Sequence, residues 1–175
     1  MAMPGAPVEI AIYEWSGARS QRVLLDWTRL ETPADVTRAA DVLRGVRRAK
    51  AHPSTAVGAA MRFGAVMLAR TDCWALTLDL SGDGTSNSGV RPSVARAELE
   101  AAGITVNALV VGADDQGTGD RRQGEIAALS TWFREEVIIG PGAFVETALG
   151  YEDYRAAMTR KLLREVRGMV IGKVE

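Results

Sequence analysis

The sequence has almost none of the residues from which disulfide frameworks and zinc sites are built. Its 175 residues include one cysteine, Cys73, and one histidine, His52. A single cysteine excludes an internal disulfide, and one histidine without spare cysteines leaves too few ligands for a zinc centre. Cys73 stands at the start of an apolar run, so we expect it to be a small buried hydrophobe rather than a nucleophile.

Long apolar runs and an excess of charge are also missing. No stretch approaches the roughly 20 apolar residues of a membrane span, and the first ten residues lack the features of a signal peptide, so the sequence assigns no compartment. The net charge is −1 and 25% of the residues are charged, which removes the electrostatic case for nucleic acid or an anionic membrane as the main partner. The length and the apolar fraction of 47% predict one globular domain over residues 1–175.

Strand and helix patterns alternate along the chain. Two β-type runs flank a loop of hairpin composition, and Thr32-Pro33-Ala34-Asp35 has the cap, the N1 proline and the early acid of a helix start. A hairpin followed by alternating helices and strands predicts an α/β sheet that is parallel apart from one edge strand. The expected strands are 8–15, 21–28, 74–78, 104–111 and 144–145. The expected helices are 33–46, 54 or 55 to about 69, 92–102, 125–136 and 151–166, with 112–124 as a polar loop.

The last of these helices is amphipathic. Its apolar face is expected to consist of Tyr154, Met158, Leu162 and Val166, which recur at helical spacing.

The segment 74–89, WALTLDLSGDGTSNSG, carries the most chemistry. An apolar run leads into a glycine-rich loop that holds Asp79, Ser81, Asp83 and Asn87. Such groups are costly to desolvate without a partner, and ligands of open α/β sheets bind beyond the carboxyl ends of the strands. Oxygen ligands suit a hard cation such as Mg²⁺, Ca²⁺ or Mn²⁺. The segment therefore indicates a class of site without naming its ligand.

Five segments together resemble a von Willebrand factor type A domain, the fold of integrin inserted domains. More narrowly, the chain is similar to a bacterial family of uncharacterised proteins built around that domain. The resemblance implies a three-layer α/β sandwich of Rossmann type, with a mostly parallel sheet and one antiparallel edge strand. In the order of the family, the segments are IAIYEWSGARSQRVLLDWT (10–28), HPSTAVGAAM (52–61), LDLSGDGTSNSG (78–89), AGITVNALVV (102–111) and VIIGPGAFV (137–145).

The resemblance also implies a metal-ion-dependent adhesion site at the top of the sheet. In the family, this site combines an Asp-x-Ser-x-Ser loop after the first strand, a threonine before a helix and an aspartate after the central strand. The threonine corresponds to Thr55 and the aspartate to Asp83. Asp79 competes for the second role, because Asp79, Ser81 and Asp83 share one face of an extended strand. Asp83 is preferred because it lies at the strand end beside flexible glycine.

The third part of that site has no match in this chain. The seven residues before Val8 are too few for a strand, its Asp-x-Ser-x-Ser loop and a helix. In the family this strand lies mid-sheet, between the strands that match 8–15 and 74–80. We therefore expect an N-terminally incomplete domain, either through truncation or because another segment or chain fills the gap.

Simpler explanations account for the same residues. Asp83 and Thr55 are also typical of turns that are held by local side-chain hydrogen bonds. Glu14 and Asp26 are expected to face solvent on the hairpin rather than to form a carboxylate pair for glycoside hydrolysis. The glycine loops do not match phosphate-binding motifs. The four tryptophans are expected in the core or at its rim: Trp15, Trp27, Trp74 and Trp132.

The leading interpretation is a non-enzymatic protein-interaction domain. A divalent cation held by Thr55 and Asp83 would be bridged to a carboxylate of an unknown protein ligand. We expect Mg²⁺, or Mn²⁺ or Ca²⁺, to bind weakly or not at all, because two protein oxygens leave the ion mostly hydrated.

The sequence leaves two alternatives open. One is a Mg²⁺-dependent hydrolase that uses Asp79 and Asp83 to activate water, with Arg91 as the only candidate phosphate ligand beside the loop. The other is a truncated chain without autonomous function. In either case, the open edges of 8–15 and 74–80 predict self-association through strand addition.

Overall fold

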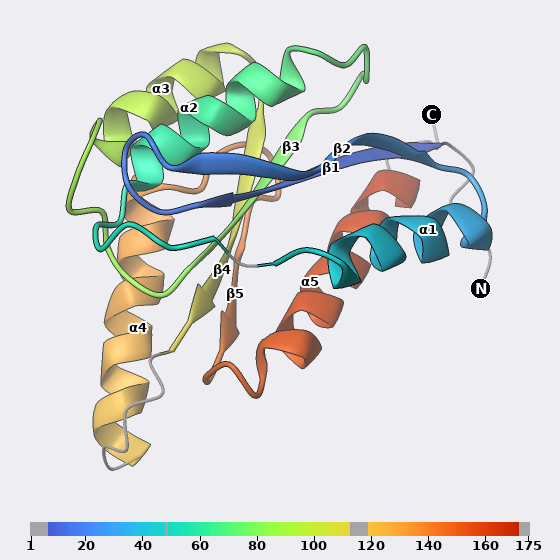
Figure 1. Ribbon diagram of the computed structural model, residues 1–175. Coiled ribbons are helices and arrows are strands. Elements are labelled where there is room, and N and C mark those ends of the chain that lie inside the picture. The colour runs from blue at the N-terminus through green and yellow to red at the C-terminus, as the bar shows by residue number, and fades with distance from the viewer. Residues whose placement is uncertain (1–6, 48, 113–118, 172–175) are drawn as a thin grey trace.

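The computed structural model describes residues 7–47, 49–112 and 119–171, and Figure 1 shows how their helices and strands are arranged. Side chains are described for these residues except 119–122 and 167–171. The elements follow the order β1 (Val8–Trp15), β2 (Gln21–Leu30), α1 (Pro33–Arg44), α2 (Val57–Leu68), β3 (Thr77–Gly82), α3 (Pro92–Ala101), β4 (Thr105–Val111), α4 (Gly119–Glu136), β5 (Val145–Ala148) and α5 (Tyr154–Ile171).

The strands form an antiparallel pair and a parallel group of three. β1 and β2 are a hairpin whose register runs from Val8 opposite Leu30 to Trp15 opposite Gln21. The order β3-β4-β5 is parallel throughout. These observations confirm the α/β class, but the strands form two sheets rather than one. In the described ranges, no strand pairs with the second edge of β1 or of β3, and these two strands do not pair with each other.

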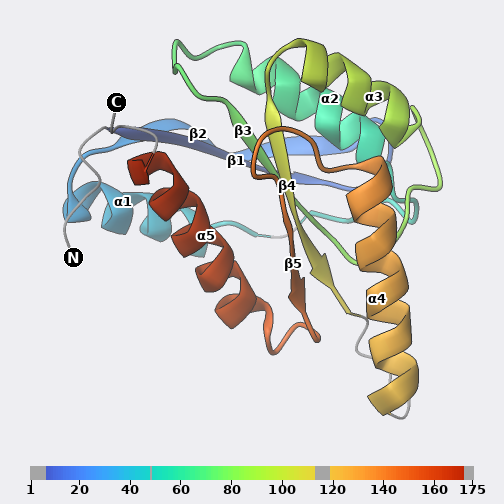
Figure 2. The same cartoon turned by 180° about the vertical axis from the view of Figure 1, so that it is seen from behind.

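The two faces of the three-stranded sheet are covered by different helices. Leu80 and Val106 point into the main core, where Phe133 of α4 and residues of α2 and α3 are also buried. Leu109 points to the other face and packs against Ala157 of α5. Figure 2 shows α5 along one side of β4 and β5 and α4 along the other. This arrangement is the expected three-layer sandwich.

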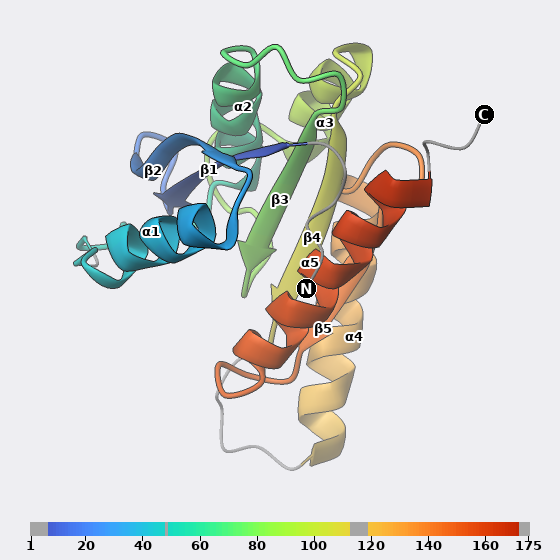
Figure 3. The ribbon, with the colours of Figure 1, turned by 90° about the vertical axis from the view of Figure 1, so that its right-hand side faces the viewer.

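The hairpin is fastened to α2. The hydroxyl of Tyr13 donates to the carbonyl of Ala60 at 2.8 Å, and the indole of Trp27 donates to the carbonyl of Met67 at 3.0 Å. Gly64 allows this close approach, because a Cβ there would lie 2.5 Å from Leu78 and 2.9 Å from the Tyr13 hydroxyl. Figure 3 shows the hairpin with α1 on one side of the molecule and the three-stranded sheet with α5 on the other.

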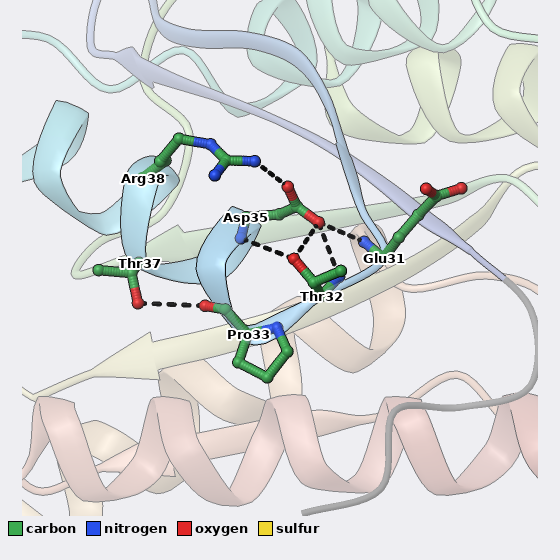
Figure 4. A network of polar contacts seen from close by, with 6 residues as sticks. All are labelled: Glu31, Thr32, Pro33, Asp35, Thr37 and Arg38. Atoms are coloured by element: carbon green, nitrogen blue, oxygen red, sulfur yellow. Dashed lines mark hydrogen bonds and ion pairs between the residues drawn. The ribbon is translucent and has the colours of Figure 1, made fainter.

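The start of α1 confirms the helix signal read from the sequence. The Thr32 hydroxyl accepts from the amide of Asp35 at 3.3 Å, and the Asp35 carboxylate accepts from the amides of Thr32 at 2.7 Å and Glu31 at 3.0 Å (Figure 4). This reciprocal capping box satisfies amides that have no partner within the helix. Hydrogen bonds from the Thr32 side chain and from both amides lower the pKa of Asp35.

Two helix starts differ from those expected. The second helix begins at Val57, not at residue 54 or 55, because Ser54 and Thr55 are held in hydrogen bonds to Ser88 and Asn87 of the loop after β3. The hydroxyl of Ser86 accepts from the Val57 amide at 3.2 Å and so takes the place of a local cap. α4 begins at Gly119, six residues before the expected start, although the residues there are polar and include glycine. Residues 113–118 of the expected polar loop lie outside the described part of the chain.

The predictions for the central strand, for Cys73 and for the last helix were partly wrong. β3 begins at Thr77 rather than at Trp74, which is 76% exposed and lies in neither core nor rim. Cys73 is half-buried, with its thiol 3.8 Å from the Glu9 carboxylate, rather than packed as a core hydrophobe.

The buried face of α5 differs from the one expected, because Leu162 is 48% exposed and its neighbour Lys161 is fully buried. In the described part of the chain, no helix has the length and apolarity to cross a bilayer.

Candidate functional site

Three segments meet where β1 and β3 end. The carbonyl of Ser16, just after β1, accepts from the amide of Ala56 at 2.9 Å. Thr55 and Asn87 are joined twice, by the Asn87 amide to the Thr55 carbonyl and by the Thr55 amide to the Asn87 side-chain oxygen, each at 2.9 Å. The loop after β3 is therefore bonded directly to the residues before α2. The structure thus brings together the two segments that carry Thr55 and Asp83.

Several hydroxyl groups in this region are used to hold it together. Ser54 lies 2.7 Å from Nδ1 of His52 and accepts from Ser88 at 3.1 Å. Ser86 caps α2 and also donates to the Thr55 carbonyl at 3.4 Å. The Thr55 hydroxyl differs, because it has no hydrogen-bond partner among the described residues. It is half-buried and remains available to a ligand.

Asp83 directly follows β3 and is exposed. One of its carboxylate oxygens, Oδ2, accepts from the hydroxyl of Tyr151 at 2.8 Å. Tyr151 lies in the turn before α5, so this contact links the end of β3 to the C-terminal part of the molecule. The carboxylate keeps further lone pairs for a cation or a hydrogen-bond donor.

Asp79 lies in a different environment, in the middle of β3 on the face that α5 covers. Its carboxylate is in contact with the ammonium group of Lys161, whose side chain is 0% exposed. The same ammonium lies 2.5 Å from Glu165, one helical turn further along α5. Asn107 of the neighbouring strand β4 donates to Glu165 at 2.9 Å. A polar cluster therefore joins β3, β4 and α5; Lys161 and Glu165 are buried in it, whereas the Asp79 side chain is 36% exposed.

The charge balance of this cluster perturbs Glu165. Two carboxylates share one ammonium, and the side chain of Glu165 is only 8% exposed. Burial raises the pKa of Glu165 to about 7, and the nearby charge of Asp79 acts in the same direction. The proton that Glu165 takes up near neutral pH relieves the excess negative charge.

Sequence reasoning missed Lys161, Glu165 and Asn107. One signal was present, since Asn107 is a polar residue among the apolar residues of the strand Thr105–Val111, and a buried amide needs a partner. Lys161 and Glu165 are an (i, i+4) pair, which is usually solvent-exposed and gives no sign of burial.

The remaining candidates do not form sites. Glu14 is paired with Arg22 at 2.7 Å and Asp26 with Arg70 at 3.1 Å, so this supposed carboxylate pair is divided between two arginines. Arg91 is exposed and stands at the start of α3. Within the described residues, no three side chains of the histidine, cysteine and acidic types are grouped as a metal site.

The family described as "Protein of unknown function (DUF1194)" matches residues 1–170. The chain belongs to this family. No curated protein matches the sequence.

Solved structures are similar to the DUF1194 chain over most of its length. One is proximal thread matrix protein 1 from the mussel byssus, with a TM-score of 0.58 and 15% identity, covering 91% of this chain and 37% of that chain. A further structure of the mussel protein, with a zinc-occupied MIDAS motif, has a TM-score of 0.57 and 17% identity and covers 91% and 36%. BatB from Bacteroides thetaiotaomicron, a conserved hypothetical protein, has a TM-score of 0.52 and 12% identity and covers 91% and 80%.

These similarities identify the fold. The DUF1194 chain spans only about a third of the mussel protein, 37% in one structure and 36% in the other. Together with the layers and strand order described above, they confirm the von Willebrand factor type A fold that the five sequence segments indicated.

Proposed function

We propose that this chain is a non-enzymatic protein-interaction domain that binds its partner through a divalent cation at Asp83 and Thr55. The observation that supports this proposal is the direct bonding of the Thr55 segment to the loop that Asp83 begins. A carboxylate from the partner protein would complete the coordination of the cation. When bound, the cation supplies the positive charge that this carboxylate recognises.

The donor atoms suit a hard cation but are few. Asp83 offers an exposed carboxylate and Thr55 offers a hydroxyl without a hydrogen-bond partner among the described residues. Oxygen donors favour Mg²⁺, Mn²⁺ or Ca²⁺, and with two of them most of the coordination shell stays water. The role of Thr55 and Asp83 is therefore to hold and orient a hydrated ion.

The contacts of Asp79 favour Asp83 as the acidic ligand. The Asp79 carboxylate is already bound to the Lys161 ammonium, and a divalent cation would have to approach this positive charge. The same contact weakens the hydrolase alternative, because that mechanism requires Asp79 as a second ligand to hold Mg²⁺ and activate water. The interaction domain is accordingly the function that the contacts support best.

Calorimetric titration with Mn²⁺ tests the proposal. We expect a dissociation constant of about 1 mM or weaker, as in the weakest calcium modules. Asp83→Ala should abolish the binding because it removes the only carboxylate of the proposed ligand pair. Asp72→Ala is the matched control, since Asp72 is also exposed but lies before β3, away from the strand ends.

Two results would contradict the proposal. If wild-type protein, Asp83→Ala and Asp72→Ala give the same heats of binding, Asp83 is not a ligand. If wild-type protein binds Mn²⁺ at micromolar concentration, the ligand set is larger than Thr55 and Asp83, and the assignment of two protein ligands is wrong.

A further inference from the structure

The helix α2 is apolar on more than the face that it buries in the core. Of its 12 residues, Val57–Leu68, only Arg62 is charged. Ala59, Phe63 and Val66 recur at helical spacing and are not part of the main core cluster, and Val66 is 66% exposed. A helix that is apolar nearly all round usually lies buried on all sides. The exposed side of α2 therefore has the composition of a surface that another molecule covers.

These side chains line one wall of a groove between α2 and the hairpin. The groove has a volume of about 360 Å³, at the lower end of the range of ligand pockets. Ala18 and Gln21 of the hairpin and Val90 of the segment before α3 form its other walls. Figure 1 shows the turn of the hairpin close to the start of α2. The groove has room for one large apolar side chain and the backbone that carries it.

Contacts within the protein hold the walls in place. The ring of Phe63 packs edge-to-face against Tyr13, with the ring centroids 4.9 Å apart. A Cβ at Gly58 would lie 2.3 Å from the carbonyl oxygen of Val90, so the segment before α3 rests directly on α2. A groove with fixed walls loses little conformational entropy when a ligand binds, which favours its use as a binding site.

The charges at the groove favour an acidic ligand. Arg62 is the one charged residue among the described residues that line it, and it is paired with Glu98 at 2.5 Å. Arg19 and Arg91 each directly follow a lining residue in the chain, and both are exposed. Their side chains have no hydrogen-bond or ion-pair partner in the part of the chain that the structure describes. A second copy would bring the same arginines to a two-fold contact, which like-charge repulsion disfavours.

Gln21 supplies a polar group that suits a peptide backbone. Its Nε2 donates to the carbonyl of Gly17 at 3.0 Å, which fixes the side-chain amide. Its Oε1 has no hydrogen-bond partner within the described residues. This oxygen can accept from a backbone amide of a bound segment.

We propose that this groove binds an acidic segment of a partner protein, with one large apolar side chain of the segment seated on Phe63 and Val66. Carboxylates of the segment pair with Arg19 and Arg91, and one of its backbone amides donates to Gln21. The proposal goes beyond the cation site at the strand ends and requires no cation.

Peptide titrations of the ¹⁵N-labelled protein in the presence of EDTA test the proposal. The probe is the hexapeptide EDLFDE with blocked ends; KKLFKK reverses its charge and EDSSDE removes its apolar side chains. A short flexible peptide binds weakly, so we expect the amide signals of 18–21, 59–66 and 90–91 to shift at about millimolar EDLFDE. KKLFKK and EDSSDE should leave these signals in place. Added salt should weaken the binding of EDLFDE, because it screens exposed charges.

Two variants separate the apolar contact from the charge contact. Val66→Ser and Arg91→Gln should each weaken the binding of EDLFDE by about threefold or more. Val42→Ser is the matched control, because Val42 is also an exposed valine on a helix, 51% exposed, but lies on α1. Its affinity for EDLFDE should equal that of the wild type. Circular dichroism checks that the variants are folded, and the comparison of the three peptides needs no variant.

Several results would overturn the proposal. Groove signals that do not shift with EDLFDE, or that shift equally with KKLFKK, would show that the groove does not select an acidic segment. Shifts of the same signals when the protein alone is diluted would assign the groove to a second copy. Broadening of these signals by phosphatidylglycerol vesicles, without a response to EDLFDE, would assign it to a membrane surface. Since EDTA is present throughout, these results do not depend on a cation at Asp83, and failure of the cation site leaves them unchanged.

Discussion

Glu165 should make the stability of this domain depend on pH in a way that one substitution removes. Burial beside Asp79 raises its pKa from the ordinary 4.5 to about 7 in the folded state. The folded protein therefore binds a proton more tightly than the unfolded chain does. The stabilisation is fully present below about pH 4.5, and it is lost as the pH rises through 7.

The size of the effect follows from the two pKa values. Each unit of pKa difference corresponds to about 1.4 kcal/mol. The rise in the pKa of Glu165 from 4.5 to about 7 therefore contributes about 3 kcal/mol to the free energy of unfolding at low pH. The Glu165 side chain is only 8% exposed, so water screens it little. Glu165→Gln removes the titration and keeps an oxygen that can accept from Asn107 and Lys161.

Urea unfolding followed by circular dichroism at pH 5 and pH 8 measures the difference. When the pH is raised from 5 to 8, the free energy of unfolding of wild-type protein should fall by about 2 to 3 kcal/mol more than that of Glu165→Gln. Glu152→Gln removes an exposed carboxyl group from the turn before α5 and should change stability by less than about 0.5 kcal/mol. A stability difference between Glu165→Gln and wild-type protein that is the same at both pH values would refute the reasoning.

Three further predictions concern the fold. β1 and β3 each have an edge with which no strand of the described residues pairs, and neither strand contains lysine or proline. The chain should therefore self-associate at about micromolar concentration, and a stable monomer in light scattering would contradict this. Thr32→Ala removes one half of the capping box with Asp35 and should lower the free energy of unfolding by about 1 kcal/mol, whereas Thr37→Ala, inside the same helix, is the control. Gly64→Ala places a methyl group against Leu78 and should cost about 1–3 kcal/mol in the same assay; no loss would mean that α2 can move away from β3.

Local signals predicted their elements well. The hairpin strand Val8–Trp15 has the expected bounds, and α1 begins with the expected cap because the Thr32 and Asp35 side chains satisfy backbone groups within four residues of them. The predicted start of β3 was wrong because Trp74 makes the segment more hydrophobic but is itself exposed. The alternation of Leu78 and Leu80 with Asp79 and Ser81 is the better guide to this strand.

The candidate site was predicted only in part, for a physical reason. Thr55 and Asp83 were found by resemblance, and the structure brings their segments together. Their role as ligands remains a prediction. The contacts from Tyr151 and Lys161 depend on how α5 packs, which is a property of the tertiary structure. Periodicity alone favoured Leu162 over Lys161 for the buried face, because it does not weigh a paired ammonium against an exposed leucine.

The place where Mn²⁺ binds is the most direct test of the account. Mn²⁺ broadens the NMR signals of nearby amides, so a titration of ¹⁵N-labelled protein locates the ion without any substitution. The account predicts that broadening at sub-stoichiometric Mn²⁺ begins in residues 54–57 and 83–89, the two segments that are bonded together at the strand ends. Broadening that begins elsewhere, or spreads evenly over the exposed carboxylates, would contradict the cation site at Asp83 and Thr55.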